Sequence, residues 1–226
     1  MRFENLNWMD VEQYLRRDDR VILVLGACEQ HGYLSLLTDV KIPLALADAA
    51  SRQSGVLVAP PLNFGVSPYF LSYPGTISLR TETFIKVVED VVQSLYHQGF
   101  RRFLVLNGHG GNAAAQNVLI EMANRYASMR VAWYAWWQSH SVEAVAARYG
   151  LKIYHAGWAE AFSFTRVADL PTGEKRVEGY QGLLNAEETR ATFGDGVFGG
   201  AYEVSEVILQ ELFDAALQDV LALLNF

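Results

Sequence analysis

Four apolar runs separated by longer amphipathic segments constrain the fold of this chain most strongly. The runs are "RVILVLGAC" at 20–28, "SGVLVAPPL" at 54–62, "RRFLVLNG" at 101–108 and "RVAWYAWW" at 130–137. Three of them consist of adjacent apolar residues, as expected of strands that are covered on both faces. Segments with helical spacing lie between or after them, at 40–53, 81–98, 111–128 and 201–224. This alternation predicts an α/β fold, a three-layer sandwich with a mainly parallel sheet.

The segment 81–98 shows the helical pattern most clearly. We expect Thr81 to cap its start and Gly99 to end it. Its apolar positions form one stripe, made of Phe84, Val87, Val88, Val91, Val92 and Leu95. A polar, glycine-containing region follows much later, from about 169 to 201, without a repeat, a low-complexity tract or a convincing linker. We therefore interpret residues 1–226 as a single domain.

Composition narrows the class of protein. With 226 residues and 51% hydrophobic content, the chain is large enough for a sizeable core. A net charge of -7 argues against a general nucleic-acid or anionic-membrane binder. The single cysteine, Cys28, excludes an internal disulfide and is expected to be a small buried residue. No signal pattern or stretch of about 20 apolar residues is present, which predicts a soluble cytoplasmic protein without a membrane span.

Acidic and histidine residues cluster where two of the predicted strands end. Glu29, His31 and Asp39 follow the first run, and His109 lies in "NGHGGN" after the third. Functional groups collect beyond the carboxyl ends of strands in open parallel sheets. A third cluster, "YHAGWAEAFSF", holds His155 and Glu160.

Together these clusters favour a metal site. Carboxylate and imidazole ligands suit zinc, manganese or iron(II). Two divalent ions need a bridging carboxylate and further ligands for each ion. A set of three acids and two imidazoles would supply them, namely Glu29, His31, Asp39, His109 and Glu160.

Taken singly, the clusters have simpler explanations. The glycines of "NGHGGN" are compatible with a phosphate cradle at a helix N-terminus, although the lysine of a P-loop is absent. The same stretch also suits a structural turn with an incidental histidine. His155 and Glu160 lie five residues apart, so they do not share one face of a helix. Glu160 alone suits the first turn of a helix, where the dipole favours an acid.

Several motifs together resemble the creatininase family of metal-dependent amidohydrolases, which includes deformylase-like and peptide-cleaving members. The motifs are E-x-H-G followed by T-D, then "PGTISL", "NGHGGN" and "HAGWAEAFS", and they cover most of the chain. The resemblance implies that Glu29, His31, Asp39 and His109 are metal ligands, with Asp39 bridging two ions. It also places Glu160 on the acid of the family's H-A-G-x-x-E element.

The chain departs from the family pattern around the expected pocket. Gly111 stands where creatininase itself has a glutamate ligand, so Glu160 is the expected replacement. The loop "GYLSLLTD" is one residue shorter and lacks a second histidine, and Ala161 and Phe162 replace a threonine or serine. Trp137 keeps one of two tryptophans that close over creatinine, whereas Leu151 stands near the other. Creatinine is therefore not expected to be the preferred substrate.

These observations predict a hydrolase that cleaves a C–N bond of a small amide, lactam or formamide by metal-activated water. The resemblance implies that His155 transfers a proton near the leaving nitrogen. Trp137, Gly110 and Gly111 are expected to border the substrate. The alternative is a non-catalytic metal-binding or assembly protein.

Assembly and several exposed segments complete the expectations. The family resemblance implies a homo-oligomer, commonly a hexamer. Tyr69, Phe70 and Tyr73 form either a pocket rim or a subunit contact, and the loop 194–200 either closes over substrate or is an ordinary connector. His97 and His140 are expected at a helix end and a helix start, without a functional role.

Overall fold

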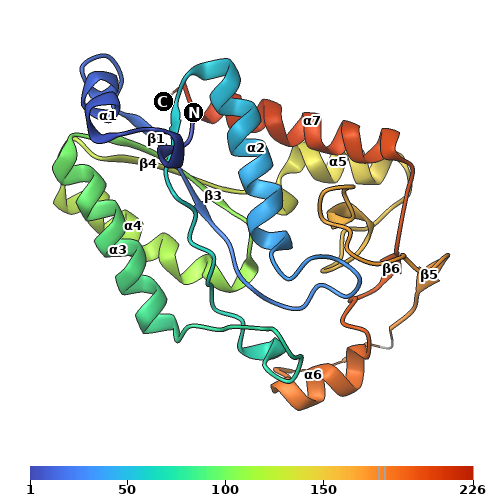
Figure 1. The fold of residues 1–226 in the computed structure, drawn as a ribbon. Coiled ribbons are helices and arrows are strands. Elements are labelled where there is room, and N and C mark those ends of the chain that lie inside the picture. Colours follow the sequence, from blue (N-terminus) through green and yellow to red (C-terminus); the bar gives the residue numbers. More distant parts are fainter. Residues whose placement is uncertain (178, 181, 226) are drawn as a thin grey trace.

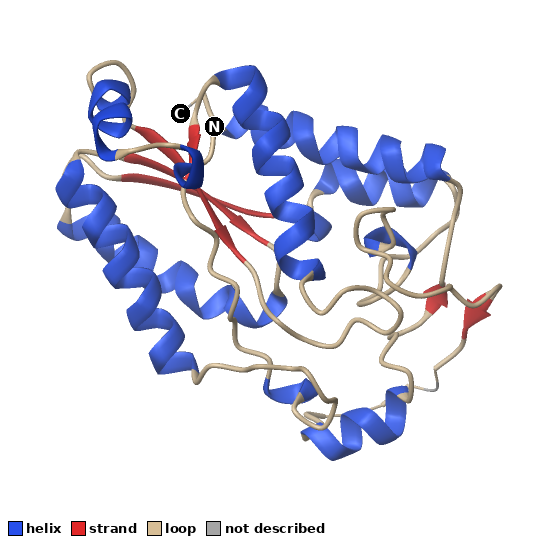
Figure 2. Ribbon diagram, viewed as in Figure 1, coloured by secondary structure: helices blue, strands red, loops and turns tan. Residues whose placement is uncertain are grey.

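A parallel four-stranded sheet forms the middle layer of the molecule (Figures 1 and 2). The computed structural model describes residues 1–177, 179–180 and 182–225. The strands are β1 (Arg20–Leu25), β2 (Leu57–Val58), β3 (Arg102–Asn107) and β4 (Arg130–Ala135), in the order β2-β1-β3-β4. β1 and β3 are paired in parallel from Arg20↔Arg102 to Leu25↔Asn107. Their carboxyl ends therefore lie at the same edge of the sheet.

Helices cover both faces of this sheet, which confirms the predicted α/β three-layer architecture (Figure 2). One face carries α2 (Thr38–Ser54), α5 (His140–Arg148) and α7 (Glu206–Leu223). The other carries α1 (Trp8–Leu15), α3 (Thr81–Gln98) and α4 (Ala115–Arg125). In β1, Ile22 and Val24 pack into the first core, whereas Val21, Leu23 and Leu25 pack into the second. A strand buried on both faces explains the unbroken apolar run.

Every predicted strand is present, and each is shorter than the apolar run that predicted it. Only Leu57–Val58 of the segment 54–62 is a strand. Pro60 and Pro61 follow closely and have no N–H to donate to a ladder. The segment 130–137 leaves the sheet at Ala135 and continues as the 3₁₀ turn η4 (Trp136–Gln138).

The predicted helices are also present, with differences at their starts. The segment 111–128 begins as the 3₁₀ turn η3 (Gly110–Ala114) and becomes α-helical only in α4. In α3, the prediction that Thr81 caps the start is wrong, because Thr81 is already helical and Arg80 precedes it without a side-chain cap. Gly99 ends α3 with φ 120°, as predicted. The exposed His97 and His140 lie in the last turn of α3 and at the start of α5.

Two helices that the apolar pattern did not reveal have a local signal in the sequence. Asn7 begins α1 and Asn185 begins α6 (Ala186–Phe193), each with an acid three residues later that completes a capping box. α6 packs against the 3₁₀ turn η2 (Pro68–Phe70). The short antiparallel strands β5 (Glu174–Lys175) and β6 (Gly200–Ala201) flank it in the sequence. In the described ranges, no helix is long and apolar enough to cross a membrane.

Candidate metal centre

The topology creates a crevice beyond the carboxyl ends of β1 and β3. After β1 the chain passes through α2 to β2 on one side, and after β3 it passes through α4 to β4 on the other. The two connections run along opposite faces, so they diverge at this switch point. Glu29 and His31 follow β1, Asp39 lies in the first turn of α2, and His109 follows β3. The sheet order therefore brings the first two sequence clusters together.

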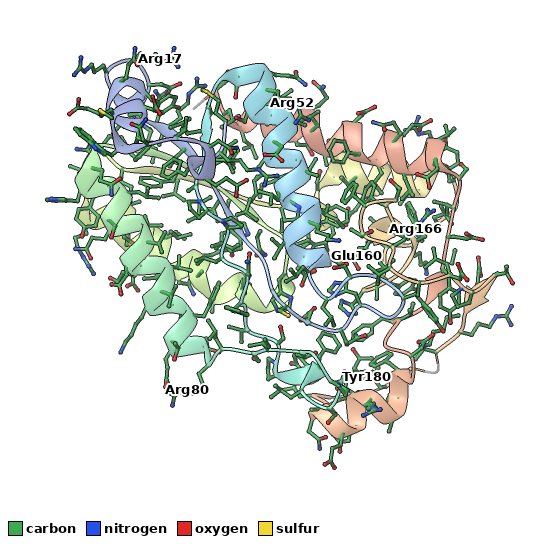
Figure 3. All side chains as sticks on the ribbon, in the orientation of Figure 1. Arg17, Arg52, Arg80, Glu160, Arg166 and Tyr180 are labelled. Carbon is green, nitrogen blue, oxygen red and sulfur yellow. The ribbon has the colours of Figure 1, made fainter. Side chains whose placement is uncertain are left out.

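The third cluster joins them, so all the proposed ligands lie in one buried group. The residues Glu29, His31, Asp39, His109 and Glu160 are each at most 8% exposed. Figure 3 shows Glu160 in the interior near the start of α2. His155 borders the group, with its ring 4.4 Å from that of His31 and its Nδ1 3.8 Å from Glu29 Oε1.

Asp39 lies at the centre of two sets of donor atoms. Its Oδ1 is 2.9 Å from His31 Nε2, and its Oδ2 is 3.0 Å from His109 Nδ1. Glu160 Oε2 lies 3.8 Å from His31 Nε2, and Glu29 Oε1 lies 3.3 Å from His109 Nδ1. The donor atoms of Glu29, Asp39 and His109 lie within 4.8 Å of one another, as do those of His31, Asp39 and Glu160. Asp39 is the member that the two sets share.

Each imidazole is oriented by a hydrogen bond from its outer nitrogen. His31 Nδ1 lies 3.2 Å from the Glu29 carbonyl oxygen, and His109 Nε2 lies 2.8 Å from the Val66 carbonyl oxygen. A carbonyl only accepts, so these nitrogens carry the protons of the neutral rings. In the neutral rings the lone pairs lie on His31 Nε2 and His109 Nδ1, the nitrogens that face the acids. Such backbone contacts commonly orient histidine ligands.

The inner polar atoms of the cluster are better suited to binding a cation than to hydrogen bonding with one another. Glu29 Oε2, His31 Nε2 and Asp39 Oδ2 are buried and make no hydrogen bond, although the acids and imidazoles approach to 2.9–3.3 Å. Buried polar atoms without partners are costly, so native structures rarely leave several together. Nitrogen and carboxylate donors in this arrangement suit zinc, manganese or iron.

The pKa values of the cluster show how strongly its charges interact. Burial lowers the pKa of His31, but Asp39 and Glu160 outweigh it and raise the value to about 10. His109 also has its pKa raised well above the ordinary value, because Glu29 and Asp39 outweigh burial. Burial raises the pKa of Glu160 to about 7. Bound protons and bound cations compete for the same atoms, so a metal ion would displace the imidazole protons.

The glycines of "NGHGGN" permit close backbone approach. A Cβ on Gly108 would lie 1.9 Å from the Asp39 carbonyl oxygen, and one on Gly111 would lie 1.9 Å from the Val66 carbonyl oxygen. A Cβ on Gly110 would meet nothing within 4 Å. Gly108 therefore lets the end of β3 lie directly against the start of α2. These contacts explain two of the glycines without a bound phosphate.

The asparagines of the same motif fix the loop. Asn107 Nδ2 donates to the His109 carbonyl at 2.7 Å, and Asn112 Nδ2 donates to the Gly26 carbonyl at 3.1 Å. Both asparagines are at most 2% exposed. The motif thus ties the loop after β3 to the loop after β1.

Gln30 is a site residue that the sequence interpretation missed. Its Oε1 accepts from the Gly32 N–H at 3.1 Å, and its Nε2 donates to the Gly196 carbonyl at 3.0 Å. These two bonds fix the amide, so the other Nε2 proton points toward His155 Nε2, 2.9 Å away. The backbone carbonyl oxygen of Gln30 also lies 3.2 Å from His155 Nε2. The only sequence signal for Gln30 is its place between Glu29 and His31.

His155 is neutral in this environment. Burial and then the charge of His31 lower its pKa well below the ordinary value. With Gln30 Nε2 as the donor, the ring proton lies on Nδ1, which faces Glu29; the Gln30 backbone carbonyl, 3.2 Å from Nε2, accepts a bond only in the other tautomer.

The carboxylate of Glu160 accepts a hydrogen bond from a residue with an unusual backbone conformation, Ala156. The segment forms the 3₁₀ turn η5 (Trp158–Glu160), not an α-helix. Ala156 has φ 58°, a left-handed conformation that is uncommon outside glycine. Its N–H donates to Glu160 Oε2 at 2.6 Å.

A cavity of about 580 Å³ opens onto the cluster. Gly110, Gly111 and Trp137 line it, as do Tyr69 and Phe70, which favours the pocket-rim alternative for these two aromatics. Trp136 instead lies in the core at 1% exposure.

Leu151 and Cys28 have structural surroundings. Leu151 packs against the core under α2, α5 and α7 and is not among the described residues that line the cavity, so the expectation that it replaces an aromatic lid is wrong. Cys28 is a buried free thiol, as predicted. Asp39 reaches the cluster from the first turn of α2.

The fold and the site define a class: a three-layer α/β protein with buried carboxylates and imidazoles at the switch point of its sheet. A family model described as "Creatininase: Creatinine amidohydrolase" matches residues 4–224. The chain belongs to the creatininase family.

Relatives of known name agree with this assignment. The chain is 33% identical over 115 residues to a creatinine amidohydrolase of Pseudomonas putida, covering 48% of this chain and 44% of that protein. It is 32% identical over 120 residues to a mycofactocin precursor peptide peptidase of Mycolicibacterium smegmatis, covering 50% and 48%. The matched stretches thus span less than half the length of these curated relatives. A crystal structure of creatinine amidohydrolase shares the fold, with a TM-score of 0.78 at 23% identity over 98% of this chain and 95% of that chain.

Proposed function

We propose that the protein is a metal-dependent hydrolase that cleaves a C–N bond of an amide. Five residues would hold two divalent ions: Glu29, His31, Asp39, His109 and Glu160. The observation that carries the proposal is the position of Asp39, whose two carboxylate oxygens each face a different imidazole within 3.0 Å. One ion would lie between Glu29, Asp39 and His109, and the other between His31, Asp39 and Glu160.

The comparisons support zinc or manganese as the metal, with iron as a third candidate from the donor chemistry. Solved creatininases of similar fold include one described as a zinc–zinc type and one described as a manganese form. Two such ions, when bound, polarise a carbonyl group and lower the pKa of water. The chain's own residues hold them in place and supply the proton transfers.

His155 is the proposed proton carrier. It is neutral near pH 7, so it first takes up a proton and then transfers it to the departing nitrogen. Gln30 contacts His155 Nε2, so that His155 Nδ1 faces Glu29 in the cluster. Phe70 and Phe198 pack against its ring at 4.7 Å and 4.9 Å and restrict access of water.

The substrate is a small-molecule amide, lactam or formamide, and creatinine is not the preferred one. Three features support this choice: the cavity volume of about 580 Å³, the aromatic residues that line it, and the diversity of the named relatives. The relatives include a 3-dehydro-scyllo-inosose hydrolase of Thermotoga maritima, so family membership alone does not define the substrate. A cytoplasmic location and a homo-oligomer, commonly a hexamer, stay predictions.

Metal content and turnover test the proposal together. We expect about two ions per chain by elemental analysis, activity on a panel of amides, loss of activity with EDTA, and recovery with zinc, manganese or iron(II). His109→Ala should lose metal and turnover, whereas His97→Ala, which changes an exposed histidine on α3, should keep both. Full activity after rigorous metal removal would refute the mechanism. Bound metal without turnover of any amide would favour the non-catalytic alternative.

A further inference from the structure

One wall of the cavity is a continuous series of aromatic rings. It begins at His155 and passes to Phe198, whose ring lies 4.9 Å away. Phe198 stacks on Phe193 at 3.9 Å, and Phe193 meets Tyr180 edge-on at 5.4 Å. Phe70 stacks on His155 from another side at 4.7 Å. We call Phe70, Phe193, Phe198 and Tyr180 the ring wall.

The ring wall leads from the buried cluster to solvent. Phe193 is 3% exposed, whereas Tyr180 is 51% exposed. Figure 3 shows Tyr180 at the margin of the molecule beside α6, with Glu160 further inside. All four rings line the same cavity, together with the apolar Ile153, Leu183 and Leu184. An apolar group in the cavity would therefore replace water along most of this wall.

Among the described residues, the cavity lining contains no cationic side chain for an anionic substrate group. Within the described part of the chain, no lysine or arginine lines it, whereas Glu29, Asp39 and Glu160 do. Arg190 lies on α6 next to Thr189, which lines the cavity, but its Nη1 donates to the Ser72 carbonyl at 2.7 Å. A carboxylate on this side of a substrate would lose hydration without gaining a partner.

We propose, on the basis of the hydrolase function above, that the leaving amine of the substrate carries an uncharged, ring-sized apolar group that packs on the ring wall. The side follows from His155, which Phe70 and Phe198 contact at 4.7 Å and 4.9 Å and which, in the proposed function, protonates the leaving nitrogen. In the reaction, the carbonyl carbon gains a bond to the oxygen of water and loses its bond to nitrogen. One proton of that water goes to the nitrogen, so the products are a carboxylic acid and an apolar amine.

Two isomeric amides test the proposal with metal-replete protein. N-acetylphenethylamine carries its ring on the amine side, and N-methylhydrocinnamamide carries it on the acyl side. N-ethylacetamide lacks the ring, and N-acetyl-β-alanine places a carboxylate where the ring would be. Burial of a ring side chain predicts a kcat/KM for N-acetylphenethylamine that is roughly tenfold or more above the other three.

Variants of the ring wall complete the experiment. Tyr180→Leu, at a half-exposed position, should reduce the preference for N-acetylphenethylamine over N-ethylacetamide several-fold. Tyr149→Leu removes a ring of similar exposure on the far end of α5 and should leave that preference unchanged. Leu183→Lys should raise kcat/KM for N-acetyl-β-alanine by supplying the missing charge.

The outcomes separate this proposal from the hydrolase itself. Turnover with equal kcat/KM for the two isomers, or a preference for N-methylhydrocinnamamide or N-acetyl-β-alanine, would overturn the ring-wall proposal and leave the hydrolase intact. No turnover of any amide by protein with two bound ions would overturn the hydrolase and, with it, the assignment of the leaving side.

Discussion

Asp39 is the residue on which both halves of the cluster depend. Burial raises the pKa of Asp39, but His31 and His109 outweigh burial and hold the pKa well below its usual range. The carboxylate is therefore charged, and one oxygen faces each imidazole. Asp39→Asn should reduce metal content from about two ions per chain to below one, measured by elemental analysis. Asp48→Asn is the matched control, because Asp48 lies on the same helix but pairs with Arg2. Two ions retained in Asp39→Asn would contradict the shared position of this carboxylate.

Gln30 acts through His155 rather than on the substrate. Gln30→Leu removes the donor to His155 Nε2 while keeping much of the side-chain volume. We expect kcat to fall by about 10–100-fold with metal content unchanged, which is typical of partners that orient site residues. Gln116→Leu, at an exposed position on α4, should be neutral. A variant that loses metal instead would show that Gln30 supports the fold of the loop.

At the scale of elements, the contact between the end of β3 and the start of α2 determines where Asp39 lies. Gly108→Ala would place a methyl group 1.9 Å from the Asp39 carbonyl oxygen and force the two elements apart. The free energy of unfolding should fall by about 1–3 kcal/mol or more, measured by denaturant titration. Gly110→Ala is the control, because nothing lies within 4 Å of its added carbon. Equal stability of the two variants would contradict this account.

The opposite edge of the sheet has its own electrostatic contact. Burial raises the pKa of Asp18, but Arg20 and, to a smaller extent, Arg102 outweigh burial and lower it. The Asp18 carboxylate lies 2.6 Å from Arg20 Nη2. The folded state therefore binds the Asp18 proton less tightly than the unfolded state. The resulting stability is present above the unfolded pKa of about 3.9 and disappears as the pH falls through the folded value.

Acid unfolding tests this contact. Asp18→Asn should be less stable than the unmodified protein at neutral pH, and the difference should shrink below about pH 4. Asp169→Asn, at an exposed position, is the control. The measurement is the free energy of unfolding of both proteins as a function of pH. A stability difference that grows on acidification would contradict the lowered pKa of Asp18.

At the scale of the whole molecule, bound metal should contribute to stability because the cluster joins α2, β3 and the segment around Glu160. A ligand at 100 times its dissociation constant stabilises a protein by about 2.7 kcal/mol. For a chain of this length that corresponds to a rise in Tm of roughly 5–10 °C. Calorimetry with and without EDTA should show this shift in Tm. The Tm of His109→Ala should be the same with and without the chelator.

The predicted homo-oligomer is also a property of the whole molecule. Several apolar side chains are exposed, among them Trp8 at 71% and Val207 at 66%. Light scattering on the 25.3 kDa chain should give a multiple of that mass, commonly sixfold. A monomer at micromolar concentration would contradict the expectation.

Much of the architecture could be predicted because each buried strand carries its own pattern. The run at 20–25 is apolar on both faces, and β1 is indeed buried on both. The cluster could be anticipated because parallel strands place Glu29, His31 and His109 at one edge. Gln30, the left-handed Ala156 and the ring wall depend on contacts between distant segments, such as the bond from Gln30 to Gly196, and no local pattern encodes these.

The two central imidazoles present opposite nitrogens, Nε2 in His31 and Nδ1 in His109. An asparagine amide reaches about as far from the backbone as Nδ1, and a glutamine amide about as far as Nε2. The two positions therefore have different conservative neighbours in sequence space: glutamine at 31 and asparagine at 109. His31→Gln and His109→Asn would each keep an amide close to the original ligand nitrogen while removing the imidazole.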